Sequence, residues 1–240
     1  MLLINLLEIT EKCVAAVIGC GGKTSLIGLI AGKLRDKKVL VSTTTKMHPM
    51  MAPGIVLCQT LQQCQAHQPQ IGIQCMGILN EQTGKLEALP DHVLTGLVRQ
   101  YDISLLESDG SMGLPCKGWL ESEPVVPDYC THTVGVLTLR AVGMPAHKSI
   151  VHRLPEFLSL TGLREGDTVS MEAIEAMVCS PRGMFRKSAG RRYLVVNQAE
   201  DIADINAARS FLRTISEKYP NHFTQLVYGS VHNDQWYNIQ

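Results

Sequence analysis

The sequence lacks an excess of charge of either sign, because 22 lysines and arginines balance 22 aspartates and glutamates. It has no lysine- or arginine-rich run, and both absences argue against nucleic acid or an anionic membrane surface as a partner. No apolar run is long enough to span a bilayer. The apolar N-terminal residues follow no basic segment and are soon interrupted by Glu8 and Glu11, which argues against a secretory signal. We therefore predict a cytoplasmic protein with no membrane partner.

No two cysteines have the C-x-x-C spacing of metal and redox sites, although the chain holds eight cysteines. The chain is also too long for a small secreted domain held together by disulfides. We predict buried thiols that pack as small apolar residues. Any remaining redox chemistry would rest on Cys20 and Cys116, which lie inside two motifs described below.

Short apolar runs alternate with segments of helical spacing along most of the 240 residues. The apolar runs predict strands at residues 13–19, 37–45, 54–58, 71–79, 102–110, 132–139, 191–196 and 223–231. The helical spacing predicts helices at residues 23–37, 61–67, 90–100 and 201–218, and a mostly helical segment at 144–178.

This alternation predicts an α/β protein with a mostly parallel sheet and helices on both faces, a three-layer fold of the P-loop NTPase type. We expect one domain over residues 1–240, with an added strand and helix region at 54–90 and a helical insertion at 144–180. Ligands bind at the carboxyl ends of the strands in such sheets. The candidate motifs all follow predicted strands.

The segment from Gly19 to Ser25, GCGGKTS, has the composition of a phosphate-binding loop between a strand and a helix. The usual G-x-x-x-x-G-K-[ST] pattern would require glycine where Val17 stands. Read with Gly19 as its first glycine, the loop is compact and resembles that of the Mur-type ligases, which bind ATP. Lys23 would then reach the phosphates and Thr24 would ligate Mg²⁺. The competing interpretation is a glycine turn that starts a helix and carries a surface lysine.

This prediction gives a role to every position of the loop. The nucleotide-contacting residues would be Gly19, Cys20, Gly21, Gly22, Lys23, Thr24 and Ser25.

A second motif, ESDG, follows a predicted strand and offers Glu107, Asp109 and Gly110. It fits E-x-x-G and resembles the switch motif of metallochaperone-type GTPases, in which an acid acts through Mg²⁺ and the glycine amide faces the γ-phosphate. Acids at the end of a buried strand need a partner, because unpaired buried charge is costly. We predict that Glu107 and Asp109 act with Lys23 in catalysis and hold the metal with Thr24. The sequence leaves open which of the two acids is the main metal-side group.

Two further strand ends carry candidate nucleotide contacts. Thr44, Thr45 and Lys46 follow the second predicted strand and would meet phosphate or metal-bound water, although threonine is also a common strand residue. Asn197 occupies the place of the asparagine in the guanine-reading N-K-x-D motif. Gln198 stands where that motif has lysine, so ATP and GTP both remain candidates.

The ordered set GCGGKTS, STTTKM, ESDGSMGLPCK, EPVVP, VHR and VVNQAED resembles the selenium-dependent hydroxylase accessory proteins, the YqeC-like family, over nearly the whole chain. The resemblance implies a P-loop nucleotide-binding protein associated with selenium-dependent molybdenum hydroxylases and molybdenum-cofactor maturation. It implies nucleotide, a molybdenum hydroxylase, or that enzyme's cofactor or selenium precursor as partners. A homodimer is compatible with such a protein, and no residue argues for it.

Three functions compete at this point. The first is Mg²⁺-dependent NTP hydrolysis by a maturation factor. The second is transfer of a phosphoryl or nucleotidyl group to a small cofactor or selenium species, with Lys117, Arg140, His152 and Arg153 binding the acceptor. The third is a non-catalytic scaffold that senses nucleotide.

Overall fold

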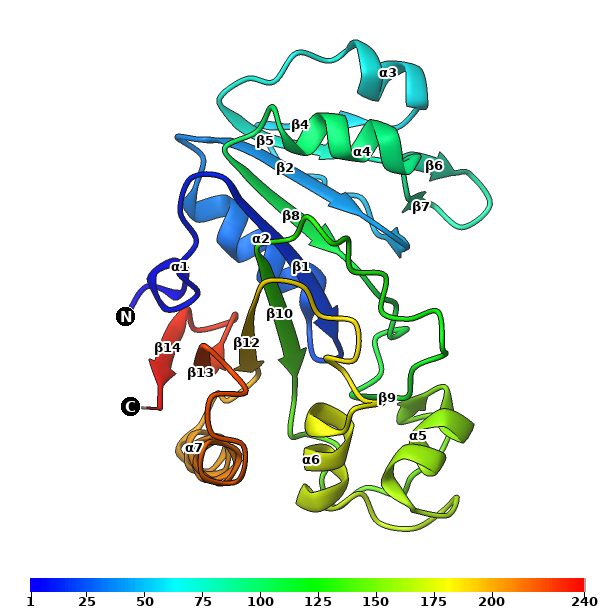
Figure 1. Ribbon diagram of the computed structural model, residues 1–240, viewed down its shortest axis with the longest axis vertical. Helices are drawn as coiled ribbons and strands as arrows, with labels where there is room; N and C mark the ends of the chain where they lie inside the picture. Colours follow the sequence, from blue (N-terminus) through cyan, green and yellow to red (C-terminus); the bar gives the residue numbers. More distant parts are fainter. Residues whose placement is uncertain (240) are drawn as a thin grey trace.

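The computed structural model describes residues 1–239 and has a nine-stranded sheet as its central layer (Figure 1). The strands of this sheet are β1 (Cys13–Gly19), β2 (Lys38–Thr43), β4 (Ile55–Cys58), β5 (Gly72–Met76), β8 (Ile103–Glu107), β10 (His132–Leu137), β12 (Arg191–Val196), β13 (Gln225–Ser230) and β14 (Gln235–Asn238). Their order across the sheet is β14-β13-β12-β10-β1-β8-β2-β5-β4. Every neighbouring pair is parallel except β13 with the edge strand β14.

Helices cover both faces of the sheet. They are α1 (Leu3–Leu6), α2 (Lys23–Lys33), α3 (Leu61–Ala66), α4 (Asp91–Val98), α5 (Leu154–Thr161), α6 (Met171–Cys179) and α7 (Ile202–Lys218). One face packs on α1 and α2. The other packs on α3 and α4 over one half of the sheet and on α5, α6 and α7 over the other half. The predicted three-layer α/β class with a mostly parallel sheet is confirmed.

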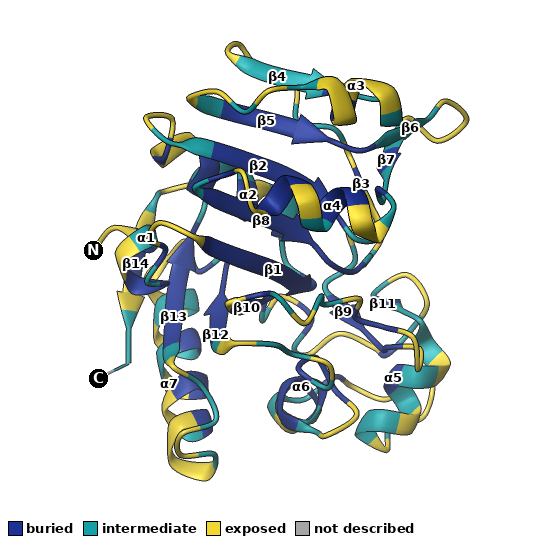
Figure 2. Cartoon of the chain, turned by 45° about the horizontal axis from the view of Figure 1, so that its top comes forward, coloured by how far each residue is buried: buried dark blue, intermediate teal, exposed yellow. Residues whose placement is uncertain are grey.

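Strand β1 lies at the centre of the sheet and is buried along its whole length (Figure 2). Successive side chains of a strand point to opposite faces. Ala15 and Val17 therefore join the core under α2, whereas Ala16 and Ile18 join the cores on the other face. An apolar residue at every position is what a parallel strand covered on both faces requires.

Two small sheets complete the structure. Strands β3 (Lys46–Met47), β6 (Ile78–Asn80) and β7 (Lys85–Glu87) form an antiparallel sheet in the order β3-β7-β6. Strands β9 (Cys116–Lys117) and β11 (Val151–His152) pair in parallel.

The segments expected as additions have different places in the fold. Residues 54–90 supply β4 and β5 to the main sheet, besides α3 and the strands β6 and β7. Residues 144–180 hold β11, α5 and α6. The expectation of helix from residue 144 was wrong before residue 154, because Pro145 forms a bridge to Thr168 and β11 pairs with β9.

All eight cysteines are buried and free, as the sequence predicted. Each of the three hydrophobic cores contains at least two of them. Cys13 and Cys75 lie in the core under α2, and Cys58, Cys64 and Cys130 lie in the core that α3 and α4 help to form. Cys20, Cys116 and Cys179 lie in the core on the side of α5, α6 and α7.

Candidate functional site

The loop between β1 and α2 depends on three glycines. Gly19, Gly21 and Gly22 have φ angles of +98°, +125° and +100°, a range that residues with side chains rarely adopt. Space is also restricted, because a methyl group at Gly19 would lie 2.4 Å from the Val136 carbonyl oxygen and one at Gly21 would lie 2.6 Å from the Leu137 carbonyl carbon. The glycines thus allow the loop to turn tightly against β10.

Lys23 is the first residue of α2, and its side chain folds back over the loop. Only 4% of the residue is exposed, and its Nζ donates a hydrogen bond of 2.8 Å to the Gly19 carbonyl oxygen. Nζ also lies 3.2 Å from an Asp109 carboxylate oxygen and 3.9 Å from one of Glu107. Burial lowers the pKa of Lys23, but the two carboxylates outweigh that effect and the pKa is raised. The ammonium group is therefore charged at the mouth of the loop.

The two acids of the second motif lie in different surroundings. Asp109 is fully buried and accepts hydrogen bonds from the Gly19 N–H at 3.0 Å and from Trp119 Nε1 at 2.9 Å. It also forms an ion pair of 3.4 Å with the fully buried Lys117. Its oxygens are thus engaged with the protein interior.

Glu107 instead borders a cavity and accepts a hydrogen bond of 2.7 Å from Thr24 Oγ1. Burial raises the pKa of this carboxyl, and the nearby Lys23 opposes the effect only in part.

The cavity measures about 420 Å³ and lies where β1 and β8 end and α2 begins. One wall is the start of α2, a second is the segment after β8, and a third comes from the small β3-β7-β6 sheet. Its lining residues are Gly22, Lys23, Thr24, Ser25, Lys46, Met47, His48, Lys85, Glu107, Gly110, Ser111, Met112 and Gly113.

The structure therefore brings seven of the predicted site residues to one cavity: Gly22, Lys23, Thr24, Ser25, Lys46, Glu107 and Gly110. The remaining predicted residues do not line it: Gly19, Cys20, Gly21, Thr44, Thr45, Asp109 and Asn197. Cys20 is fully buried, and burial raises the pKa of its thiol to about 12, so this thiol stays protonated at neutral pH. The Thr44 hydroxyl donates to the Val125 carbonyl oxygen at 2.6 Å.

Asn197 holds the loop from the side of β12. Its Nδ2 donates to the Gly21 carbonyl oxygen at 2.7 Å, and its Oδ1 accepts from the Val231 N–H at 3.0 Å. Only 4% of the residue is exposed. Both ends of the amide are thus used inside the protein, and the side chain connects the ends of β1, β12 and β13.

The residues considered as an acceptor site do not form one cluster. Lys117 and Arg153 both pair with Glu123, at 3.3 and 2.8 Å. Arg140 instead pairs with Glu200 at 2.9 Å, beside β12.

Sequence reasoning missed cavity residues that come from outside the motifs. His48 and Lys85 lie on or next to the small sheet, outside every motif, whereas Met112 and Gly113 lie within the segment ESDGSMGLPCK of the sequence analysis. Nothing in the local sequence of Lys85 distinguishes it from a surface lysine of a hairpin. His48 had a weak signal, because it lies two residues after the predicted contact Lys46.

The cavity wall suits Mg²⁺ in its donor atoms. The Thr24 hydroxyl and the Glu107 carboxylate, 2.7 Å apart, are hard oxygen ligands. Among residues 1–239, no group of three or more His, Cys, Asp or Glu side chains is placed to hold a metal alone. A hydroxyl with one carboxylate fits an ion that takes its other ligands from phosphate and water, as Mg²⁺ does.

No helix within residues 1–239 combines the length and the apolar character that a bilayer crossing needs. The sequence is similar to the uncharacterized protein YqeC of Escherichia coli (strain K12), with 28% identity over 228 residues that cover 90% of this chain and 88% of that protein. No solved structure matches the chain. The sequence model of the family described as "YqeC protein" matches residues 15–155. The chain therefore belongs to the YqeC family.

Proposed function

We propose that the protein binds a nucleoside triphosphate with Mg²⁺ in the cavity at the start of α2 and hydrolyses it. We further propose that it does so as an accessory protein in the maturation of selenium-dependent molybdenum hydroxylases or their cofactor. The observation that carries the first proposal is the charged, buried Lys23, held between the Gly19 carbonyl oxygen and two carboxylates at the edge of this cavity. The second rests on the family resemblance.

The first turn of α2 supplies the other groups that a phosphate needs. No side chain caps the helix, and its first turn holds no acid. The backbone N–H groups at a helix start have no partner within the helix and carry a partial positive charge, so they bind anions. Gly22, Lys23, Thr24 and Ser25 all border the cavity, and these N–H groups are the ones that we assign to the phosphates.

Each polar side chain around the loop has a separate task in this proposal. Lys23 exchanges its contacts with Gly19 and Asp109 for the terminal phosphates. Thr24 and Glu107 hold Mg²⁺, which offsets the negative charge of the phosphates when it is bound. Glu107 orients water on the cavity side. Asp109 keeps the Gly19 N–H in place and acts on catalysis only through the loop. We thus assign the metal-side role to Glu107 and a positioning role to Asp109.

The test is nucleotide binding by the wild-type protein and a Lys23→Ala variant, measured by calorimetry with ATP, GTP and CTP in the presence of Mg²⁺. We expect the variant to lose at least about tenfold in affinity, because a charge-assisted contact to phosphate is worth about 1.5–3 kcal/mol. Lys33→Ala is the matched control, because Lys33 ends the same helix and pairs with Asp234 on the surface. Unchanged affinity of Lys23→Ala would show that the loop is not the nucleotide site.

One observation favours group transfer as a second candidate function. Lys46, His48 and Lys85 line the cavity away from the loop, and they would suit a second anion next to the nucleotide. Phosphate release by the protein alone would support hydrolysis. Release that requires molybdopterin or selenide would support transfer to one of those acceptors.

A further inference from the structure

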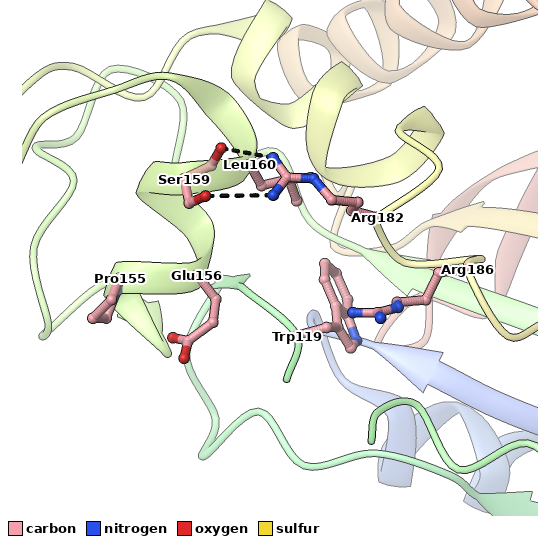
Figure 3. Close-up of a pocket in the computed structure, with 7 residues that line it drawn as sticks. All are labelled: Trp119, Pro155, Glu156, Ser159, Leu160, Arg182 and Arg186. Atoms are coloured by element: carbon pink, nitrogen blue, oxygen red, sulfur yellow. Dashed lines mark hydrogen bonds between the residues drawn. The ribbon is translucent and has the colours of Figure 1, made fainter. Parts of the chain in front are cut away.

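A second cavity, of about 280 Å³, lies between α5 and the turn that follows α6 (Figure 3). Glu156, Ser159 and Leu160 line it from α5, and Arg182 and Arg186 line it from the turn. The indole of Trp119 lies between these two walls. The volume is just below the roughly 300 Å³ at which pockets for drug-sized ligands begin, so it suits a ligand of one or two rings.

The two arginines make hydrogen bonds to the protein but are not neutralised. Arg182 donates to the Ser159 carbonyl oxygen at 3.0 Å, and Arg186 donates to the Leu120 carbonyl oxygen at 3.2 Å. Within residues 1–239, neither guanidinium forms an ion pair with a carboxylate. A guanidinium has five N–H donors, so each arginine keeps donors free for an anion.

The opposite wall has the complementary chemistry. Glu156 lies on α5, across the cavity from Arg186, and forms no ion pair within the described part of the chain. An ionised carboxylate only accepts hydrogen bonds, so it calls for an N–H donor on the ligand. Leu160 and Trp119 offer apolar contact between the charged groups.

We propose that this cavity binds a small nitrogen heterocycle that carries a phosphate group. The phosphate lies at Arg182 and Arg186, the ring packs against Trp119 and Leu160, and a ring or amino N–H donates to Glu156. Phosphate is the preferred anion because it accepts bidentate hydrogen bonds from more than one guanidinium.

The cavity also lies directly behind the proposed nucleotide loop. Trp119 donates its Nε1–H to Asp109, and Asp109 accepts from the Gly19 N–H. Met184, which lies between the two arginines in sequence, packs so close to Gly19 that a methyl group there would lie 2.9 Å from its Cε. Resting on the proposed function, a ligand in this cavity would thus contact Trp119, which supports the nucleotide loop through Asp109.

The test uses pyridoxamine 5′-phosphate as the probe and calorimetry of the full chain as the measurement. We expect saturable binding at millimolar concentrations or below, and weaker binding of pyridoxamine or inorganic phosphate alone. The double variant Arg182→Gln, Arg186→Gln should bind the probe at least about tenfold more weakly, because it loses charge-assisted hydrogen bonds. Glu156→Gln should weaken binding of the probe and leave inorganic phosphate unaffected.

Two controls separate this site from the nucleotide loop. Lys187→Gln removes one positive charge from a neighbouring exposed residue that does not line the cavity, and it should bind the probe as the wild type does. Lys23→Ala should also bind the probe normally, whatever it does to nucleotide binding. The proposal is overturned if the wild type shows no saturable heat, if the double arginine variant binds equally well, or if Lys23→Ala abolishes binding.

Discussion

At the scale of single residues, the Asp109 carboxylate connects three segments of the molecule. It bonds to Gly19 in the loop, to Trp119 behind it and to Lys117 on β9, and Lys23 lies 3.2 Å away. A carboxylate with this many donors is stable when buried because its charge is compensated on all sides.

We expect Asp109→Asn to lower the free energy of unfolding by about 3–5 kcal/mol, since it leaves two buried ammonium groups short of a partner. Urea unfolding followed by circular dichroism measures the loss. Asp234→Asn is the control, because Asp234 pairs with the exposed Lys33 and its loss should cost less than about 1 kcal/mol. Equal losses in the two variants would contradict the structural role of Asp109.

Glu107 should make stability depend on pH in a predictable direction. Burial raises its folded-state pKa above the unfolded value, so the folded protein favours the protonated form. The cost of ionising the buried carboxyl is absent below the unfolded pKa and complete above the folded pKa. Glu107→Gln removes this cost and keeps an acceptor for Thr24. The melting temperature of the variant minus that of the wild type should therefore increase as the pH rises from about 4 to 8. A difference in melting temperature that does not change with pH would contradict this prediction.

Asn197 should affect ATP and GTP alike. Both ends of its amide bond to the backbone of Gly21 and Val231, and the side chain is 4% exposed, so we expect it to position the loop and not to select a base. We expect Asn197→Ala to weaken both nucleotides by the same factor, within about twofold, in calorimetric titrations. A loss confined to GTP would show that this asparagine reads the base.

At the scale of elements, a glycine-to-alanine substitution should have opposite effects on stability in the loop after β1 and in helix α2. Gly21→Ala should lower stability by at least about 1–3 kcal/mol, because its φ is +125° and a methyl group would lie 2.6 Å from Leu137. Gly32→Ala, in the last turn of α2, meets no atom within 4 Å and should raise stability by up to about 0.5–1 kcal/mol. Thermal unfolding of both variants checks the pair. Stabilisation by Gly21→Ala would mean that the loop adopts another conformation.

The main sheet could be predicted from the sequence because its strands are short apolar runs between helices. Strand β1, the glycine turn and α2 follow each other as the pattern of residues 13–34 predicts. Strand β14 was not predicted, because its four residues, Gln235–Asn238, are too few and too polar to show a strand pattern. The small β3-β7-β6 sheet was missed for a similar reason, since strands of two or three residues have no periodicity to detect.

The sequence predicted the positions of site residues only where those residues directly follow a strand of the parallel sheet. The sequence placed Lys23, Thr24 and Glu107 at neighbouring strand ends, and the structure brings these residues to one cavity. It could not separate Glu107 from Asp109, because the difference between them is burial. Nor could it place Lys85, which reaches the cavity through pairing between residues distant in sequence.

At the scale of the whole molecule, the thiols should be nearly inert until the fold opens. Burial raises the pKa of Cys13 and Cys75 to about 11, and that of Cys130 and Cys179 to about 12. A rise of two units lowers the thiolate fraction about a hundredfold, and the thiolate is the reactive form. We expect Ellman's reagent to label all eight cysteines rapidly in denaturant and none on that timescale in the native protein. Fast native labelling of one thiol would locate a region that opens without global unfolding.

The distribution of these cysteines has a consequence for measuring motion. Because every hydrophobic core has its own thiols, mass spectrometry of labelled peptides can follow the opening of each core separately, with no engineered probe. Cys20 lies inside the glycine loop, so its labelling rate reports on that loop. A ligand that orders the loop should slow the labelling of Cys20 while the rate at Cys64, on the buried side of α3, stays the same. The labelling rates of the native cysteines thus report how often each hydrophobic core opens.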